Sequence, residues 1–130
     1  MKIVIDTSAI IAVVTNEPHK NKIIKATLGA ELIAPPSVHW EIANAFSAMF
    51  KQKRISLENS LKCIDEYRTI PIRFFEVDLK KSLDLSFNHN MYAYDAILIA
   101  CSLSNNAPLL TLDKNLIATA KEAGVKPLEI

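Results

Sequence analysis

The stretch KIVIDTSAIIAVV, residues 2–14, predicts a strand, a turn and a helix in immediate succession. Its first part, residues 2–5, is dominated by β-branched side chains, which is typical of a strand buried on both faces. The polar residues 6–8 are of the types that begin helices, and the apolar residues 9–14 continue as a short helix. A buried strand that leads directly into a helix favours an α/β fold.

The rest of the chain continues this alternation. Further strands are predicted at residues 31–34, 72–77, 108–112 and 125–130. Further helices are predicted at residues 19–29, 37–53, 57–68, 79–89, around 91–100, and at 114–124. Strands that alternate with helices predict a central, mainly parallel sheet covered on both faces, which is a three-layer α/β/α sandwich. We expect residues 1–130 to form a single domain.

The composition restricts the function. Lys and Arg (15) nearly balance Asp and Glu (14), and the net charge is only +1. Any binding of nucleic acid must therefore depend on a local basic patch or on bound cations. No apolar run approaches the roughly 20 residues that span a bilayer, so we expect no membrane partner. Cys63 and Cys101 fit reduced, buried thiols, which favours a cytoplasmic protein.

Four carboxylates have apolar neighbours, unlike most acidic residues of the chain: Asp6, Glu41, Asp95 and Asp113. Asp6 and Asp113 each end a predicted strand, and the carboxyl ends of parallel strands share one edge of a sheet. Glu41 and Asp95 lie early in predicted helices. Taken singly, each acid has another explanation, as a helix N-cap, a first-turn acid or an exposed helix residue. Together they favour one shared site at this edge.

A shared site of this kind requires positive charge. Crowded carboxylates repel one another, which raises their pKa values unless a cation is supplied. No His or Cys cluster accompanies them, whereas Thr7, Ser8 and Thr111 add hydroxyl groups. A set of oxygen ligands suits a hard cation, Mg²⁺ or Mn²⁺. Such an ion can activate water and stabilise the charge that develops in phosphodiester cleavage.

The order VIDTS, Glu41, YDA and TLD resembles that of the PIN-domain ribonucleases, and the chain length suggests the VapC toxins of type II toxin–antitoxin pairs. The resemblance implies a PIN-like fold and an Mg²⁺- or Mn²⁺-dependent endoribonuclease. It also implies a homodimer with RNA as substrate and a cognate antitoxin as partner. The implied site residues are the catalytic, metal-coordinating Asp6, Glu41, Asp95 and Asp113, and the supporting polar Thr7, Ser8, Asn44 and Thr111. Apart from the resemblance, Lys114 directly follows Asp113 and is a candidate substrate contact, although a solvated lysine explains it equally well.

Two other interpretations remain open from the sequence. A catalytically silent PIN-like module could bind RNA or a protein without cleaving anything. A phosphatase of the haloacid dehalogenase type would also place an Asp after its first strand, but it needs a second Asp two residues later, where this chain has Ser8. Nucleotide-binding folds with a glycine-rich phosphate loop are disfavoured because the chain contains only two glycines.

Overall fold

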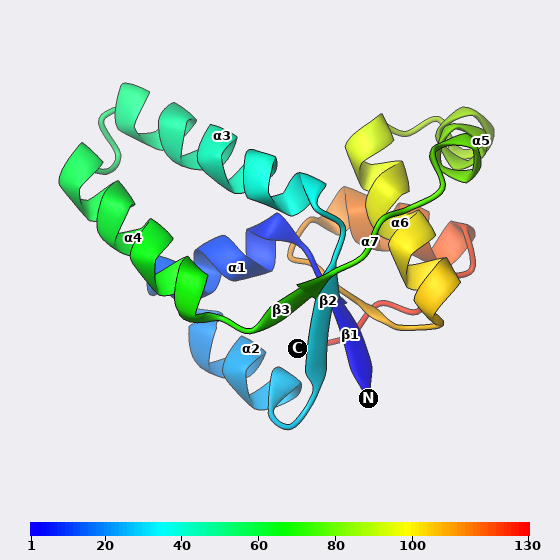
Figure 1. Cartoon of the computed structure of the whole chain (residues 1–130), viewed down its shortest axis with the longest axis horizontal. Coiled ribbons are helices and arrows are strands. Elements are labelled where there is room, and N and C mark those ends of the chain that lie inside the picture. The colour runs from blue at the N-terminus through cyan, green and yellow to red at the C-terminus, as the bar shows by residue number, and fades with distance from the viewer.

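The computed structural model describes all of residues 1–130 and contains a four-stranded sheet between two groups of helices (Figure 1). The strands are β1 Lys2–Ile5, β2 Glu31–Ala34, β3 Ile72–Phe74 and β4 Leu109–Leu110. The helices are α1 Thr7–Val14, α2 Lys20–Thr27, α3 Ser37–Lys51, α4 Leu57–Thr69, α5 Leu79–His89, α6 Ala93–Asn105 and α7 Lys114–Glu122. The predicted alternation of strands and helices is confirmed.

The sheet has the strand order β3-β2-β1-β4, and every pairing in it is parallel. β1 lies inside the sheet, with Ile3 opposite Leu32 of β2 and Val4 opposite Leu109 of β4. Residues 3–5 are buried, as expected for a strand that is covered on both faces. The carboxyl ends of all four strands therefore point to one end of the sheet.

The helices form the two outer layers. α1 to α4 gather on one side of the sheet in Figure 1, and α5 to α7 gather on the other side. Several of these helices begin at side chains that accept hydrogen bonds from free backbone N–H groups: Asp6 for α1, Ser56 for α4, Asp78 for α5 and Asp113 for α7. The three-layer α/β/α sandwich predicted from the sequence is the observed fold.

The predicted strand at residues 125–130 is wrong. The segment makes one isolated bridge, in which Pro127 lies opposite Leu109. The Leu109 N–H donates to the Lys126 carbonyl at 3.0 Å, and the Leu128 N–H donates to the Leu109 carbonyl at 2.8 Å. These two bonds flank Pro127, and the pairing goes no further because β4 itself is only two residues long. The strands predicted at residues 72–77 and 108–112 are also shorter than expected.

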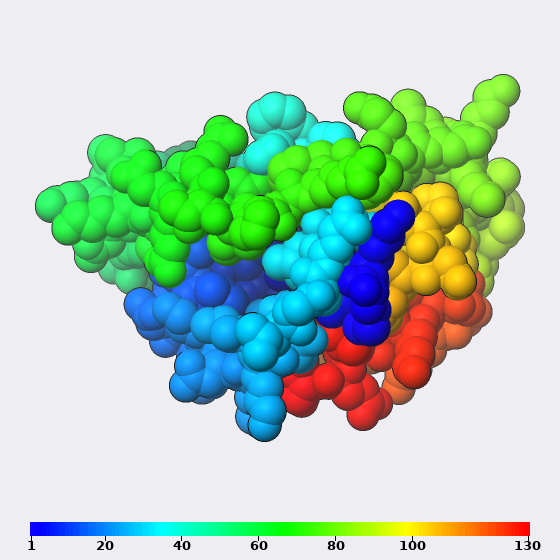
Figure 2. All heavy atoms as spheres, turned by 60° about the horizontal axis from the view of Figure 1, so that its bottom comes forward, coloured from blue at the N-terminus to red at the C-terminus, as the bar shows by residue number.

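The start of the chain lies at the amino end of the sheet. Figure 2 views this end, where the start of the chain lies between β2 and the end of α6, with the C-terminal segment below it. The chain thus starts at the amino end of the sheet, and the strands lead into helices at the carboxyl end. None of the helices is both long enough and apolar enough to span a lipid bilayer.

Candidate active site

Asp6 and Asp113 lie at the same end of the sheet. Asp6 directly follows β1 and caps α1, and Asp113 follows β4 after two residues and caps α7. Because β1 and β4 are parallel neighbours, both acids lie beyond the carboxyl ends of adjacent strands. In open parallel sheets this is the region in which ligands commonly bind.

Glu41 and Asp95 approach the same region from two helices. Glu41 lies in the second turn of α3, which begins soon after the end of β2, and Asp95 lies in the first turn of α6. The negative charge of Asp6 acts on both side chains, and Asp95 also interacts with Asp113. The structure therefore brings the four predicted carboxylates together at one end of the sheet.

Three donors hold the Asp6 carboxylate. The backbone N–H of Thr7 donates to Oδ1 at 2.7 Å, while the hydroxyls of Ser8 and Thr111 donate to Oδ2 at 3.0 and 2.7 Å. The Asp6 side chain is nearly buried, with the residue 6% exposed. A buried carboxylate with three hydrogen bonds has its orientation fixed by the fold.

The hydroxyls of Ser8 and Thr111 also join the ends of β1 and β4. The two hydroxyl oxygens lie 3.2 Å apart. Ser8 Oγ accepts from the Leu112 N–H at 3.0 Å, and Thr111 Oγ1 accepts from the Asp113 N–H at 3.1 Å. These polar groups consequently fix the backbone that carries Asp113 relative to the backbone that carries Asp6.

Glu41 is only partly compensated. Its Oε2 accepts a hydrogen bond from the Thr7 hydroxyl at 3.2 Å, but its Oε1 is buried and has no partner. Burial, followed by the charge of Asp6, raises the pKa of Glu41 to about 7. The Thr7 hydrogen bond partly opposes this rise, and Asp95 adds a smaller repulsion.

Asp95 is affected in the same way. Burial, followed by the charges of Asp113 and Asp6, raises its pKa above the usual range. The ion pairs of the structure involve other acids, so no Lys, Arg or His neutralises any of the four. This end of the sheet carries negative charge without a matching positive group.

These residues fit a hard divalent cation. Such an ion would pair with the free Glu41 oxygen and offset the repulsion that raises the pKa values of Glu41 and Asp95. A donor set made only of oxygen atoms also suits it. As the side chains stand, no three His, Cys, Asp or Glu groups are arranged to hold one ion together. Coordination by more than two of the acids would therefore require their side chains to move.

The remaining predicted residues are less constrained. Asp113 is exposed, and its Oδ1 accepts from the N–H groups of Asn115 and Leu116, so it serves as a helix cap whether or not it binds an ion. Asn44 lies one turn after Glu41 and is exposed. Lys114, also exposed, is the first residue of α7.

The sequence did not indicate how the start of α3 is fixed. His39, which no sequence motif singles out, bonds through Nδ1 to the hydroxyl of the buried Tyr67 at 2.7 Å. Its ring packs on Phe74, with the ring centres 4.3 Å apart. These contacts join α3 to α4 and β3 close to Glu41. No local pattern could reveal them, because the partners are far apart in the sequence.

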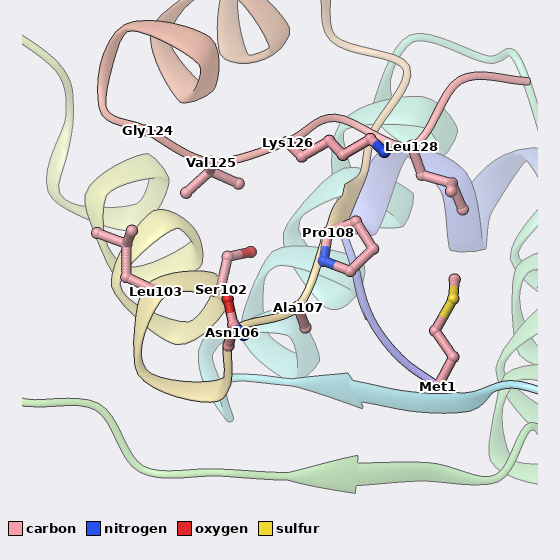
Figure 3. A pocket seen from close by; sticks show the side chains of 10 residues that line it. All are labelled: Met1, Ser102, Leu103, Asn106, Ala107, Pro108, Gly124, Val125, Lys126 and Leu128. Carbon is pink, nitrogen blue, oxygen red and sulfur yellow. The ribbon is translucent and has the colours of Figure 1, made fainter.

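A cavity of about 360 Å³ lies at the opposite, amino end of the sheet (Figure 3). Met1, Pro108, Val125 and Leu128 contribute to its walls, and Lys126 is its one charged side chain. It contains no acid and none of the predicted site residues. Its size alone therefore does not make it a catalytic site, and the carboxylate end remains the candidate.

The PIN domain family model matches residues 3–122. The chain belongs to the PIN domain family, which confirms the resemblance seen in the motifs and places it outside the haloacid dehalogenase type. No protein of curated function matches the sequence.

Three solved structures share the fold. PAE2754 from Pyrobaculum aerophilum is 21% identical, with a TM-score of 0.74 over 98% of this chain and 92% of that one. VapBC2 from Rickettsia felis, bound to a DNA fragment from the promoter, is 13% identical, with a TM-score of 0.71 over 98% and 97%. VapC20 from Mycobacterium tuberculosis, a toxin that cleaves the sarcin–ricin loop, is 13% identical, with a TM-score of 0.63 over 89% and 93%.

Proposed function

We propose that this chain is a metal-dependent endoribonuclease that hydrolyses RNA phosphodiester bonds and acts as the toxin of a toxin–antitoxin pair. The observation that carries the proposal is the Glu41 carboxylate, which lies beside Asp6 with one buried oxygen unpaired and no ion pair. A fold that concentrates negative charge in this way is suited to a divalent cation and, through it, to a phosphate group.

The proposed roles follow from the surroundings of each acid. Asp6, Glu41, Asp95 and Asp113 would hold Mg²⁺ or Mn²⁺. When bound, the ion would lower the pKa of a water molecule and balance the charge of the phosphodiester. Thr7, Ser8 and Thr111 orient the ligands through their hydrogen bonds to Glu41 and Asp6. Asn44 and Lys114, both exposed beside these acids, are available to the substrate.

We propose RNA as the substrate and an antitoxin as the partner, supported by the similar structures. One of them is a toxin that cleaves the sarcin–ricin loop of RNA, and another is a VapBC complex. The chain also exposes a stripe of large apolar side chains on α5, Leu79, Leu83 and Phe87, of which Phe87 is 87% exposed. An exposed apolar stripe of this kind supports assembly with a further chain.

The other proposed properties are a single PIN domain over residues 1–130, a homodimer and a cytoplasmic location. Light scattering on the purified protein tests the dimer, for which the expected mass is twice that of one chain. The two cysteines are present as free thiols, which suits a reducing compartment.

Incubation of the purified chain with mixed RNAs and Mn²⁺ tests the activity. Attack of water at phosphorus leaves 5′-phosphate and 3′-hydroxyl ends, and this is the expected product. Products with 2′,3′-cyclic phosphate would show that the RNA's own 2′-hydroxyl attacks, which contradicts the proposed mechanism. Binding of RNA without any cleavage in Mn²⁺ or Mg²⁺ would favour the silent binding module.

A further inference from the structure

A second cavity adjoins the candidate active site. It measures about 300 Å³ and lies between α7, the turn that precedes α2 and the C-terminal segment. Thr111 forms part of its wall, and the hydroxyl of the same Thr111 donates to Asp6 at 2.7 Å. Lys114, next to the cap residue Asp113, is also in the wall. The cavity therefore lies along the side of α7 and shares Thr111 with the surroundings of Asp6.

One face of α7 supplies two positive charges to this cavity. Lys114, Ile117 and Lys121 all line it, and their spacing of three and four residues places them on one face of the helix. The two lysines are separated by about 10 Å along the helix axis, with the apolar Ile117 between them. Neither lysine takes part in an ion pair.

The opposite walls add groups of both signs. His19, in the turn before α2, contributes an imidazole, and Glu129 contributes the one acidic side chain of the lining. Leu128 and Pro127 add apolar surface. The charged side chains of the lining are thus two lysines and one glutamate, in a protein whose overall charge is only +1.

We propose that this cavity is a nucleotide subsite, which binds the RNA strand next to the bond that is cleaved. The order of lysine, isoleucine and lysine along α7 matches the order of phosphate, ribose or base, and phosphate along an RNA strand. A volume of about 300 Å³ is at the lower end of the range for small-molecule pockets and suits one nucleotide. The apolar surface between the cations favours a nucleotide over inorganic phosphate.

The subsite rests on the proposed ribonuclease function and completes it. A chain with a net charge of +1 attracts RNA weakly as a whole, so its contacts with phosphate must be local. The carboxylates can contact phosphate only through a bound cation, so direct contacts with the other phosphates must come from positive side chains nearby. Lys114 and Lys121 can supply them on the side of the site where Thr111 lines the cavity.

The test compares two double variants that change the net charge equally. Lys114→Gln/Lys121→Gln removes both lysines of the subsite, whereas Lys25→Gln/Lys126→Gln removes two exposed lysines outside the subsite. We expect the subsite variant to raise KM for RNA at least about tenfold and to change kcat less than about threefold, since phosphate contacts hold the strand and do not perform the chemistry. The control variant should stay within about twofold of wild type in KM.

Two further measurements sharpen this result. In the Asp6→Asn background, where RNA is bound without being cleaved, loss of two phosphate contacts should reduce the slope of log affinity against log salt by about 1.4. Glu129→Gln should change KM in the opposite direction from the lysine variant and lower it about twofold, because it removes the acid that repels phosphate. A higher KM for Glu129→Gln would contradict the subsite.

Crosslinking locates the strand without relying on variants. RNA that contains 4-thiouridine should crosslink to peptides within residues 111–130 of the wild-type protein, and crosslinks confined to other peptides would overturn the subsite. If wild type cleaves RNA but the subsite and control variants have equal KM values, the subsite is wrong and the ribonuclease function stands. If wild type neither binds nor cleaves RNA, the proposed function fails, and the subsite fails with it.

Discussion

At the carboxyl end of the sheet, β1 and β4 lead into Asp6 and Asp113, whereas at the amino end the same two strands begin beside the cavity of Met1 and Pro108. Both ends contain polar groups that the fold has buried. At the carboxyl end they surround four acids without a cation. At the amino end Lys126 is the only charged side chain in the cavity wall.

A pair of hydroxyl groups shows what this difference means. Thr111 at the carboxyl end is buried and donates to Asp6, so its hydroxyl orients a carboxylate. Ser102 at the amino end is also buried and lines the cavity of Met1 and Pro108, but its hydroxyl has no partner. The size of a cavity is therefore a weaker guide to chemistry in this protein than the way its buried charges are held.

The largest expected effect separates two aspartates that both cap helices. Asp6→Asn should reduce RNA cleavage by about a thousandfold, equivalent to about 4 kcal/mol of transition-state stabilisation, because it removes charge from the proposed ion site. Asp78→Asn makes the same change at the cap of α5, outside the four-acid site, and should keep near-wild-type activity. Turnover measured with Mn²⁺ decides between them, and equal activity of the two variants would remove Asp6 from the site.

The next effect concerns stability with and without metal. Repulsion among the four acids opposes folding, so metal-free Asp95→Asn should melt no lower than metal-free wild type. Mn²⁺ should then stabilise wild type by about 2.7 kcal/mol when free metal is a hundredfold above its dissociation constant. The variant should gain much less. Thermal melts in chelator and in Mn²⁺ provide the measurement.

The opposite pattern would change the interpretation of Asp95. If Asp95→Asn were strongly destabilised in chelator while wild type ignored Mn²⁺, Asp95 would serve as a first-turn acid of α6 and not as a metal ligand. Mg²⁺ in place of Mn²⁺ should give the same direction of change.

A smaller effect is expected from the hydroxyls that orient the acids. Thr111→Val removes the donor to Asp6 and the acceptor of the Asp113 N–H, and should lower activity by about 10- to 100-fold. Thr119→Val makes the same change on α7, where the hydroxyl bonds only to the backbone of its own helix. Its activity should match that of wild type. A Thr111→Val enzyme with unchanged kcat and metal affinity would show that the network is only structural.

The smallest effect belongs to the amino end of the sheet. Ser102→Ala removes a buried hydroxyl that has no partner, so it should leave activity unchanged and raise the free energy of unfolding by up to about 1 kcal/mol. Urea unfolding followed by circular dichroism measures the change. A large loss of RNA cleavage in this variant would mean that the amino end takes part in function, and the two ends of the sheet would then not differ as described.

The sequence predicted the features that depend on local pattern. Residues 2–14 specified a buried strand that leads into a helix, and the parallel sheet followed from the alternation of strands and helices. Placing Asp6 and Asp113 at one edge needed only the rule that parallel strands end together. The family match, over residues 3–122, confirms the resemblance that these motifs suggested.

Features that depend on contacts between distant segments could not be predicted. The hydrogen bond from Thr111 to Asp6 joins residues 105 positions apart, and nothing near either residue specifies its geometry. The contact of His39 with Tyr67 is similar. The strand expected at residues 125–130 forms only one bridge, because its neighbour β4 is two residues long and the local apolar pattern does not specify that length. In the structure, no three of the acids are arranged to hold one ion. Their spacing in the sequence could not reveal this.

The central claim is that the carboxylate end of the sheet binds a divalent cation, and calorimetric titration with Mn²⁺ tests it most directly. Burial and Asp6 raise the pKa of Glu41 to about 7, so below that pH a proton competes with the ion, and above it the carboxylate is free. Wild type should therefore bind Mn²⁺ about tenfold more tightly at pH 8 than at pH 6, Asp78→Asn should behave identically, and Asp6→Asn should bind weakly at both pH values. Equal binding by all three proteins, or no binding by wild type at pH 8, would contradict the account.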